Sequence, residues 1–279
     1  MEKDKREQPA DEQHMWQDDR TYVKNKAYYD NGEVTDDPST HLSKMDVRSR
    51  KVTGIFAAVL LLLVLAWFIW ADSYYRADPS ATAVVSETAQ QVDDWRGGVT
   101  LGDPNAEVGF IFYPATMVDE YAYLPMLEQV AEQGVLCADA AMPFHLAALN
   151  GDACEKIMER YPEVKTWYIG GHAAGGTAAE KYAARHAEDF AGVILLAAYP
   201  PAETGLPMLS VRGSQDGVLD QDKYAAAPWS GDLTEVTING GNHAGFGLYG
   251  AQKGDGEATT SVQEQQKQTA EAILTFIKK

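Results

Sequence analysis

The chain has 279 residues, of which 41 are acidic and 23 are Lys or Arg, and its formal net charge is -18. Two cysteines are too few for a disulfide-rich scaffold, and the acidic excess argues against sequence-independent nucleic-acid binding. The length alone allows one large domain or two small ones.

The first 51 residues differ in composition from the rest. They carry 12 acidic residues and 10 Lys or Arg, with few aliphatic residues and no helical or strand period. Such a segment cannot bury enough apolar surface to offset the entropy lost on ordering, so we expect residues 1–51 to form a disordered tail. The remaining chain has 29 acidic residues and 13 Lys or Arg, and therefore holds nearly all of the net charge.

Residues 52–71 read VTGIFAAVLLLLVLAWFIWA, with no charged side chain. A helix of about 20 such residues spans the hydrocarbon layer of a bilayer, roughly 30 Å thick. A buried core helix is the alternative, but it usually shows a polar stripe, and this run has none. Trp67 and Trp70, followed by Tyr74 and Tyr75, are typical of the headgroup level. We expect a transmembrane helix whose partner is the lipid bilayer.

Basic residues mark one side of this run. Those that precede it are Lys44, Arg48, Arg50 and Lys51. By the positive-inside rule the N-terminus is cytoplasmic and residues 72–279 are extracytoplasmic, as in a single-pass signal anchor of the cell membrane. A cleaved signal peptide, cut near Ala71 or Ala83, stays open as the alternative, although about 50 residues before the run are unusual for one.

After a linker of small and polar residues, 72–90, the chain alternates short apolar runs with helical patterns. The expected strands are 108–113, 135–140, 167–170, 192–198, 208–212 and 233–238. The expected helices are 120–133, 151–160, 174–186 and 261–277. This alternation predicts one α/β domain, 91–279, with a mostly parallel sheet flanked by helices and preceded by one transmembrane helix.

One turn in this domain carries a motif without its reactive atom. Residues 167–176 read WYIGGHAAGG and lead from a strand into a helix. A strand, a tight glycine-flanked turn and a helix form a nucleophile elbow, G-x-S-x-G, which presents a serine at the edge of the sheet. The central residue here is Ala173, so the hydroxyl that would attack a carbonyl is absent.

Two later loops supply an acid and a base in matching order. Asp216 follows the strand expected at 208–212, and His243 lies in a glycine-rich loop after the strand expected at 233–238. The chain order of nucleophile, acid and base is that of α/β-hydrolases. His172 is interpreted as a filler position of the elbow. His145 either lines the pocket or is structural.

With these three loops in place, the sequence resembles the short α/β-hydrolases of the dienelactone-hydrolase-like type, which are often bacterial and sometimes membrane-anchored. The resemblance covers residues 108–279 and rests on FYP at 112–114, MPF at 142–144, the elbow, the Asp216 loop and GNH at 241–243. Family members carry serine at the position of Ala173, and Tyr-Pro-Gly-Gly or similar after the first strand. This chain has Ala115 and Thr116 at that turn.

The resemblance implies ester or amide hydrolysis without a cofactor. Serine would attack the carbonyl, His243 would move the proton and Asp216 would orient His243. The oxyanion would be held by the N–H of Ala174 and one from Ala115 or Thr116. No cluster of side chains has metal-ligand spacing, so we expect no metal site.

Replacement of the nucleophile costs a serine hydrolase on the order of a million-fold in turnover. The sequence therefore favours a membrane-anchored, non-catalytic form that retains a pocket for a small acyl or ester ligand. The alternative is a carboxylic ester hydrolase whose serine was replaced in this version. The changed turn at Ala115 and Thr116 favours the first interpretation. Cys137 and Cys154 form either a disulfide or two buried thiols.

Overall fold

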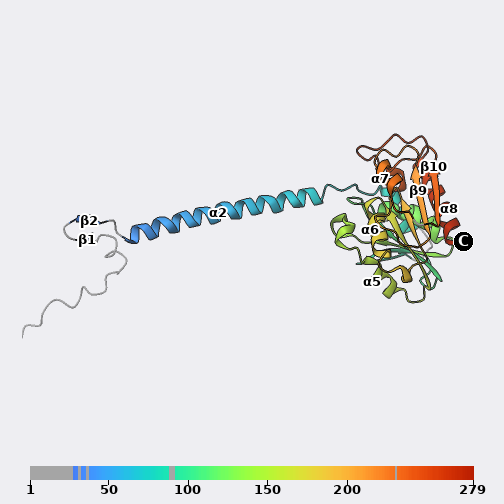
Figure 1. The fold of residues 1–279 in the computed structure, drawn as a ribbon, viewed down its shortest axis with the longest axis horizontal. Coiled ribbons are helices and arrows are strands. Elements are labelled where there is room, and N and C mark those ends of the chain that lie inside the picture. Colours follow the sequence, from blue (N-terminus) through green and yellow to red (C-terminus); the bar gives the residue numbers. More distant parts are fainter. Residues whose placement is uncertain (1–27, 31–32, 36–37, 88–91, 230) are drawn as a thin grey trace, which may run out of the picture. The chain divides into compact units, whose positions relative to one another are not determined.

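The computed structural model describes residues 28–30, 33–35, 38–87, 92–229 and 231–279, and divides the chain into two compact units, Met1–Trp67 and Phe68–Lys279. In the first unit, strands β1 (Tyr28–Asp30) and β2 (Glu33–Thr35) pair antiparallel. Helix α2 (Pro38–Ala71) follows them (Figure 1). Its segment Ser49–Ala71 is long and apolar enough to cross a membrane.

Helix α2 begins 14 residues before the apolar run, within the segment that was expected to be disordered. A helix, once nucleated, extends at little free-energy cost per residue, so the apolar run can carry the helix into the polar flank. The rest of that expectation concerns residues 1–27, 31–32 and 36–37, which lie outside the described residues.

The expected linker, 72–90, belongs to the second unit and is partly ordered there. Helix α3 (Pro79–Glu87) lies within it, and Ala81 has no exposed surface. Tyr75 forms a parallel β-bridge with Val118, and the N–H of Asp78 donates to the carbonyl of Leu248 at 2.7 Å. These contacts join segments far apart in sequence, and composition alone does not indicate them. Residues 88–91 lie outside the described residues.

The second unit is built on an eight-stranded sheet with the order β10-β9-β8-β7-β5-β6-β4-β3. The six expected strands are β5 (Val108–Tyr113), β6 (Val135–Ala140), β7 (Thr166–His172), β8 (Gly192–Leu196), β9 (Met208–Gly213) and β10 (Leu233–Ile238). They pair parallel to one another. The expected fold class, an α/β-hydrolase fold, is confirmed.

Two further strands extend one edge of the sheet. β3 (Val92–Trp95) and β4 (Gly98–Leu101) form a hairpin, and β4 pairs antiparallel with β6. They were not predicted from the sequence, because each has only four residues and the first contains two aspartates. Strand β8 ends at Leu196, two residues earlier than expected, because Ala197 takes a positive φ of 46°.

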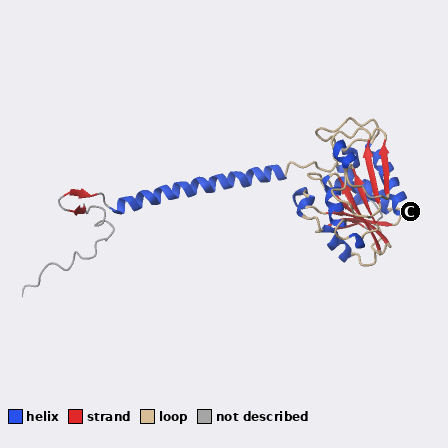
Figure 2. Ribbon diagram, viewed as in Figure 1, coloured by secondary structure: helices blue, strands red, loops and turns tan. Residues whose placement is uncertain are grey.

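Helices cover both faces of the sheet (Figure 2). They are α4 (Leu124–Ala131), α5 (Ala153–Arg160), α6 (Ala174–Ala183), α7 (Gln221–Ala226) and α8 (Val262–Ile277). The helix expected at 120–133 is instead a 3₁₀ turn, η1 (Glu120–Tyr123), followed by α4. Pro125 accounts for the break, because proline has no N–H and is accepted only in the first turn of a helix.

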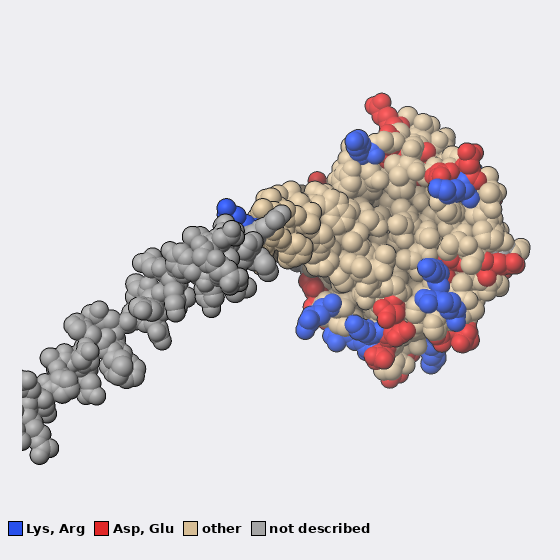
Figure 3. Space-filling model, turned by 60° about the vertical axis from the view of Figure 1, so that its left-hand side comes forward, with Lys and Arg blue, Asp and Glu red and all other residues tan. Residues whose placement is uncertain are grey.

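Strand β5 shows how the two cores form. Phe110 and Phe112 point to the layer of α4 and α8, whereas Ile111 and Tyr113 point to the layer of α5 and α6. Alternate residues of a strand face opposite sides, so a strand buried on both sides is apolar throughout. Figure 3 shows acidic and basic side chains interspersed on the face of the molecule in view, not separated by sign.

The close approach of α6 to β5 predicts the effect of one added methyl group. A Cβ on Gly175 would lie 2.2 Å from the carbonyl oxygen of Pro114 and 2.4 Å from that of Tyr113. We expect Gly175→Ala to destabilise the domain by about 2–3 kcal/mol, because backbone must move to accommodate it. Thermal melting of the full chain measures this. The control is Gly151→Ala, whose Cβ would meet nothing within 4 Å; equal melting temperatures for the two variants would contradict the close packing.

Candidate functional site

The elbow retains its strained conformation although the nucleophile is absent. β7 ends at His172 and α6 begins at Ala174, and Ala173 between them has φ 49° and ψ -122°. Residues with a side chain rarely adopt such a positive φ. A Cβ on Gly171 would lie 2.2 Å from the Tyr113 carbonyl oxygen, so the turn has no room to relax. The methyl group of Ala173 is therefore held at the apex, where a serine hydroxyl would be presented.

Strained residues gather at this edge of the sheet. Among the described residues, those other than glycine with positive φ are Met117, Phe144, His145, Ala173 and Ala197. They follow the carboxyl ends of β5, β6, β7 and β8. Each such conformation costs about 1–3 kcal/mol, and clusters of them are typical of functional sites. The carboxyl edge of the sheet is thus the candidate site.

The predicted acid and base meet at this edge. The Nδ1 atom of His243 lies 3.0 Å from Oδ2 of Asp216, and both side chains are almost fully buried. The other oxygen of Asp216 accepts hydrogen bonds from the N–H groups of Val218 (2.9 Å) and Leu219 (2.8 Å). Burial raises the pKa of Asp216. The hydrogen bond to His243 and those from the two N–H groups together outweigh this effect, so the pKa of Asp216 lies below its ordinary value.

The ionisation of Asp216 fixes the tautomer of His243. A carboxylate can only accept hydrogen bonds, so the proton between the two residues is carried by Nδ1 of the histidine. The other ring nitrogen, Nε2, then carries a lone pair and acts as an acceptor. The pair has the geometry of a general base oriented by a carboxylate.

A second acidic residue, Asp255, which was not predicted from the sequence, joins the loops that carry Asp216 and His243. One of its oxygens accepts the N–H of His243 (3.1 Å) and of Gly217 (3.1 Å), and the other accepts the N–H of Ala244 (2.8 Å). Asp255 lies between two glycines, and no motif around it indicates this role.

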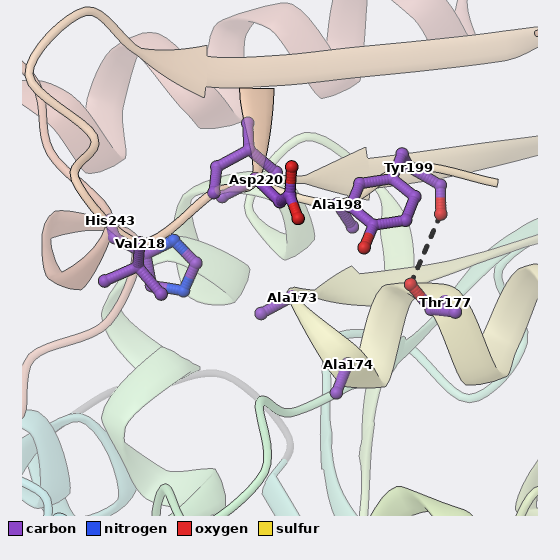
Figure 4. A pocket seen from close by; sticks show the side chains of 10 residues that line it. Ala173, Ala174, Thr177, Ala198, Tyr199, Val218, Asp220 and His243 are labelled. Carbon is purple, nitrogen blue, oxygen red and sulfur yellow. Dashed lines mark hydrogen bonds between the residues drawn. The ribbon is translucent and has the colours of Figure 1, made fainter. Parts of the chain in front are cut away.

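His243 and the elbow residues Ala173 and Ala174 border a pocket of about 340 Å³. Its lining consists of Ala173, Ala174, Thr177, Ala197, Ala198, Tyr199, Val218, Leu219, Asp220 and His243. Figure 4 shows the imidazole of His243 and the methyl group of Ala173 facing the same space. Most of the lining is apolar, and four small alanines form much of it. The pocket therefore suits a small ligand with an apolar body.

The opposite side of the elbow differs from the expected oxyanion hole. The N–H of Ala115 donates to the hydroxyl of Tyr123 at 3.3 Å, in the buried interior. Thr116 is exposed, and neither residue lines the pocket. Of the three predicted donors, only Ala174 lies at the pocket. The sequence did not indicate the role of Tyr123, which follows Ala115 by eight residues.

The same tyrosine contacts a second histidine behind the site. The hydroxyl of Tyr123 lies 2.9 Å from Nδ1 of His172. The rings of His172 and His243 have their centroids 4.4 Å apart. Burial, with a smaller contribution from His243, holds the pKa of His172 well below its ordinary value, so His172 packs as a neutral ring. His172 therefore supports the predicted base from behind.

The segment that follows the apolar helix α2 contacts this edge of the domain. The N–H of Tyr75 donates to the carbonyl of Met117 at 2.8 Å, and its hydroxyl accepts the N–H of Lys253 at 3.2 Å. Tyr74 stacks on His145 with ring centroids 3.9 Å apart. His145 is absent from the lining of the pocket at Ala173, and the structural interpretation of this residue applies.

The two cysteines are free and buried, so the structure selects the thiols over the disulfide. Burial raises the pKa of Cys154 to about 11, and its N–H donates to the hydroxyl of Tyr113 at 3.0 Å. Burial likewise raises the pKa of Cys137. Within the described ranges, no group of three or more His, Cys, Asp or Glu side chains could hold a metal ion.

The sheet order, the elbow and the Asp216–His243 pair define an α/β-hydrolase domain. Residues 109–267, more than half of the chain, match the family model described as "Alpha/beta hydrolase family". The chain belongs to that family. No curated protein matches the chain in sequence.

Solved structures share this fold at low identity. Est1E from Butyrivibrio proteoclasticus gives a TM-score of 0.50 at 15% identity, covering 69% of this chain and 100% of that one. TT1662 from Thermus thermophilus gives 0.51 at 11%, covering 69% and 100%. CarC, a serine hydrolase involved in carbazole degradation, gives 0.50 at 12%, covering 68% and 99%. At these identities the similarity shows the fold alone.

A buried carboxyl group lies one turn beyond the pocket on α6. Glu180 follows Thr177 by three residues, on the same face of the helix, and is fully buried. Burial raises the pKa of Glu180 from 4.5 to about 7, and the N–H of Ala202 opposes part of this change. The folded chain therefore holds this proton at pH values at which the unfolded chain has lost it.

This difference predicts a pH-dependent stability. Between the unfolded pKa of 4.5 and the folded value of about 7, the folded state binds more protons, so stability falls as the pH rises. We expect Glu180→Gln, which cannot ionise, to raise the melting temperature at about pH 8 and to flatten its decline from about pH 5. Parallel slopes in wild type and variant would show that Glu180 is not the titrating group.

Proposed function

We propose that this chain is a membrane-anchored, extracytoplasmic pseudohydrolase that binds a small acyl or ester-type ligand without cleaving it. The observation that carries the proposal is the conformation of Ala173. The elbow keeps the strained φ of 49° of a nucleophile position, yet the residue there has no reactive atom. A strained turn persists only where the surrounding packing enforces it, and here it shapes one end of a pocket.

The donor side of the site supports the same proposal. A hydrolase needs N–H groups aimed at the position of the oxyanion. The N–H of Ala115 points to the Tyr123 hydroxyl in the interior instead. Two parts of the catalytic machinery thus differ from those of a hydrolase, whereas the Asp216–His243 pair and the pocket are kept. This combination favours binding over catalysis.

Anchoring and orientation follow from the sequence on either side of the apolar helix. The 23 residues of Ser49–Ala71 suffice for one span. Basic residues before the span put the N-terminus in the cytoplasm, and the hydrolase domain then lies outside it. The acidic excess of that domain keeps it soluble and repels anionic lipid and nucleic acid.

A second candidate is a carboxylic ester hydrolase whose serine has been replaced in this version of the chain. The 3.0 Å contact between His243 and Asp216 favours it, because a base held in this way is what a serine nucleophile requires. The two candidates differ in how much activity a serine would restore.

The variant Ala173→Ser measures that difference. Full restoration amounts to about a million-fold in ester turnover, and loss of one oxyanion donor lowers it by about 10²–10³, so we expect a gain of about 10³–10⁴. Hydrolysis of p-nitrophenyl acetate by the full chain gives the rate, and labelling by a fluorophosphonate shows that the serine reacts. The double variant with His243→Ala is the control and should lose both signals.

Two results would decide otherwise. Steady ester hydrolysis by the unaltered chain, abolished by His243→Ala, would contradict the proposed pseudohydrolase. Restoration by Ala173→Ser to the full million-fold would favour the replaced-serine hydrolase, because it would mean that both oxyanion donors are in place.

A further inference from the structure

We propose that the ligand of this pocket is a neutral alcohol, and that its hydroxyl group occupies the position that a serine hydroxyl would take at residue 173. The inference rests on the proposed function and goes beyond it, because it names the chemical group by which the ligand is held. Among the small acyl or ester-type ligands of the proposed function, the site therefore selects those that also carry a free hydroxyl group.

His243 presents an unmatched hydrogen-bond acceptor to the pocket. Asp216 fixes the proton on Nδ1, so Nε2 is an acceptor. Among the described residues, no side chain or backbone group donates to Nε2, and His243 lines the pocket. In a hydrolase the serine hydroxyl would donate to this nitrogen. With Ala173 in its place, the donor must come from the ligand.

The N–H of Ala174 is a hydrogen-bond donor on the other side of the Ala173 methyl group. Ala174 is the first residue of α6, and the N–H groups of a first helical turn have no partner within the helix. Ala174 also lines the pocket. An oxygen near the Ala173 methyl group therefore meets an acceptor on one side and a donor on the other. A hydroxyl group is both donor and acceptor and satisfies both contacts, whereas an ether or ester oxygen satisfies only the second.

Charge argues against anionic ligands. Asp220 also lines the pocket, and its carboxylate is paired with Lys223 at 2.9 Å. Asp216 is already paired with His243. The domain around them carries a large acidic excess, so a carboxylate would be repelled. The remaining walls, which include Ala197, Ala198 and Leu219, are apolar and suit the uncharged body of an alcohol.

A comparison of two isomeric ligands tests whether the pocket binds a hydroxyl group. Benzyl alcohol and anisole have the same atoms, but only the alcohol has a hydroxyl donor. The full chain, labelled with ¹⁵N-histidine, is placed in lipid nanodiscs. Equilibrium dialysis sets the concentration of free ligand. We expect benzyl alcohol to bind about tenfold more tightly than anisole, and to shift the Nε2 resonance of His243.

Three variants separate the hydroxyl contact from general effects on the pocket. Ala173→Ser supplies its own hydroxyl to His243 and should remove the preference. Ala225→Ser adds the same hydroxyl at an exposed position of α7 outside the lining and should keep the preference. Asp216→Asn can still accept from Val218 and Leu219 but donates to Nδ1, which turns Nε2 into a donor. The oxygens of both isomers can accept from a donor, so this variant should abolish the preference for benzyl alcohol.

The outcomes distinguish this inference from the proposed function. Equal binding of the two isomers, or a preference that Asp216→Asn leaves unchanged, would overturn the hydroxyl contact while leaving a pocket that binds small neutral ligands. Binding of neither isomer at millimolar concentration, together with ester hydrolysis by the unaltered chain, would overturn both.

Discussion

The close packing of backbone around the turn between β7 and α6 is the constraint on which the site depends. Gly171 and Gly175 lie against the carbonyl groups that end β5, at distances where a side-chain carbon would clash. The residue between them must therefore take a positive φ whatever its side chain. Ala173 shows this directly, since it has the conformation of a nucleophile and none of the chemistry.

Without a nucleophile, the base of the site has no hydrogen-bond donor for its lone pair within the described part of the chain. In a hydrolase, the lone pair of the histidine is matched by the serine hydroxyl. Here Asp216 still fixes the proton of His243, and Asp255 still joins the two loops that carry them. The result is a rigid acceptor at the end of an apolar pocket. A buried acceptor without a donor is costly, so in the proposed binding function this nitrogen favours a ligand that donates a hydrogen bond.

The loops of the site also contact the segment that follows the apolar helix α2. Tyr75 pairs with the turn after β5 and contacts the loop that follows His243. Strained residues, including Met117 and His145, lie along this contact. Tyr75 and its neighbours are thus a structural part of the carboxyl edge of the sheet and do more than link it to α2.

The sequence by itself determined the features that depend on local pattern. The apolar run, the alternation of strands and helices, and the positions of Ala173, Asp216 and His243 could be read because periodicity, glycine spacing and chain order are local signals. Fold class followed from them, and the structure and family confirm it. The catalytic or binding roles of these residues stay predictions.

Only the tertiary structure decided the features that depend on contacts between distant segments. The hairpin of β3 and β4, the docking of Tyr75, the support from Asp255 and the diversion of the Ala115 N–H to Tyr123 have no signature in composition or period. Each arises because a backbone donor or acceptor must find a partner when it is buried, and packing alone determines which partner is within reach.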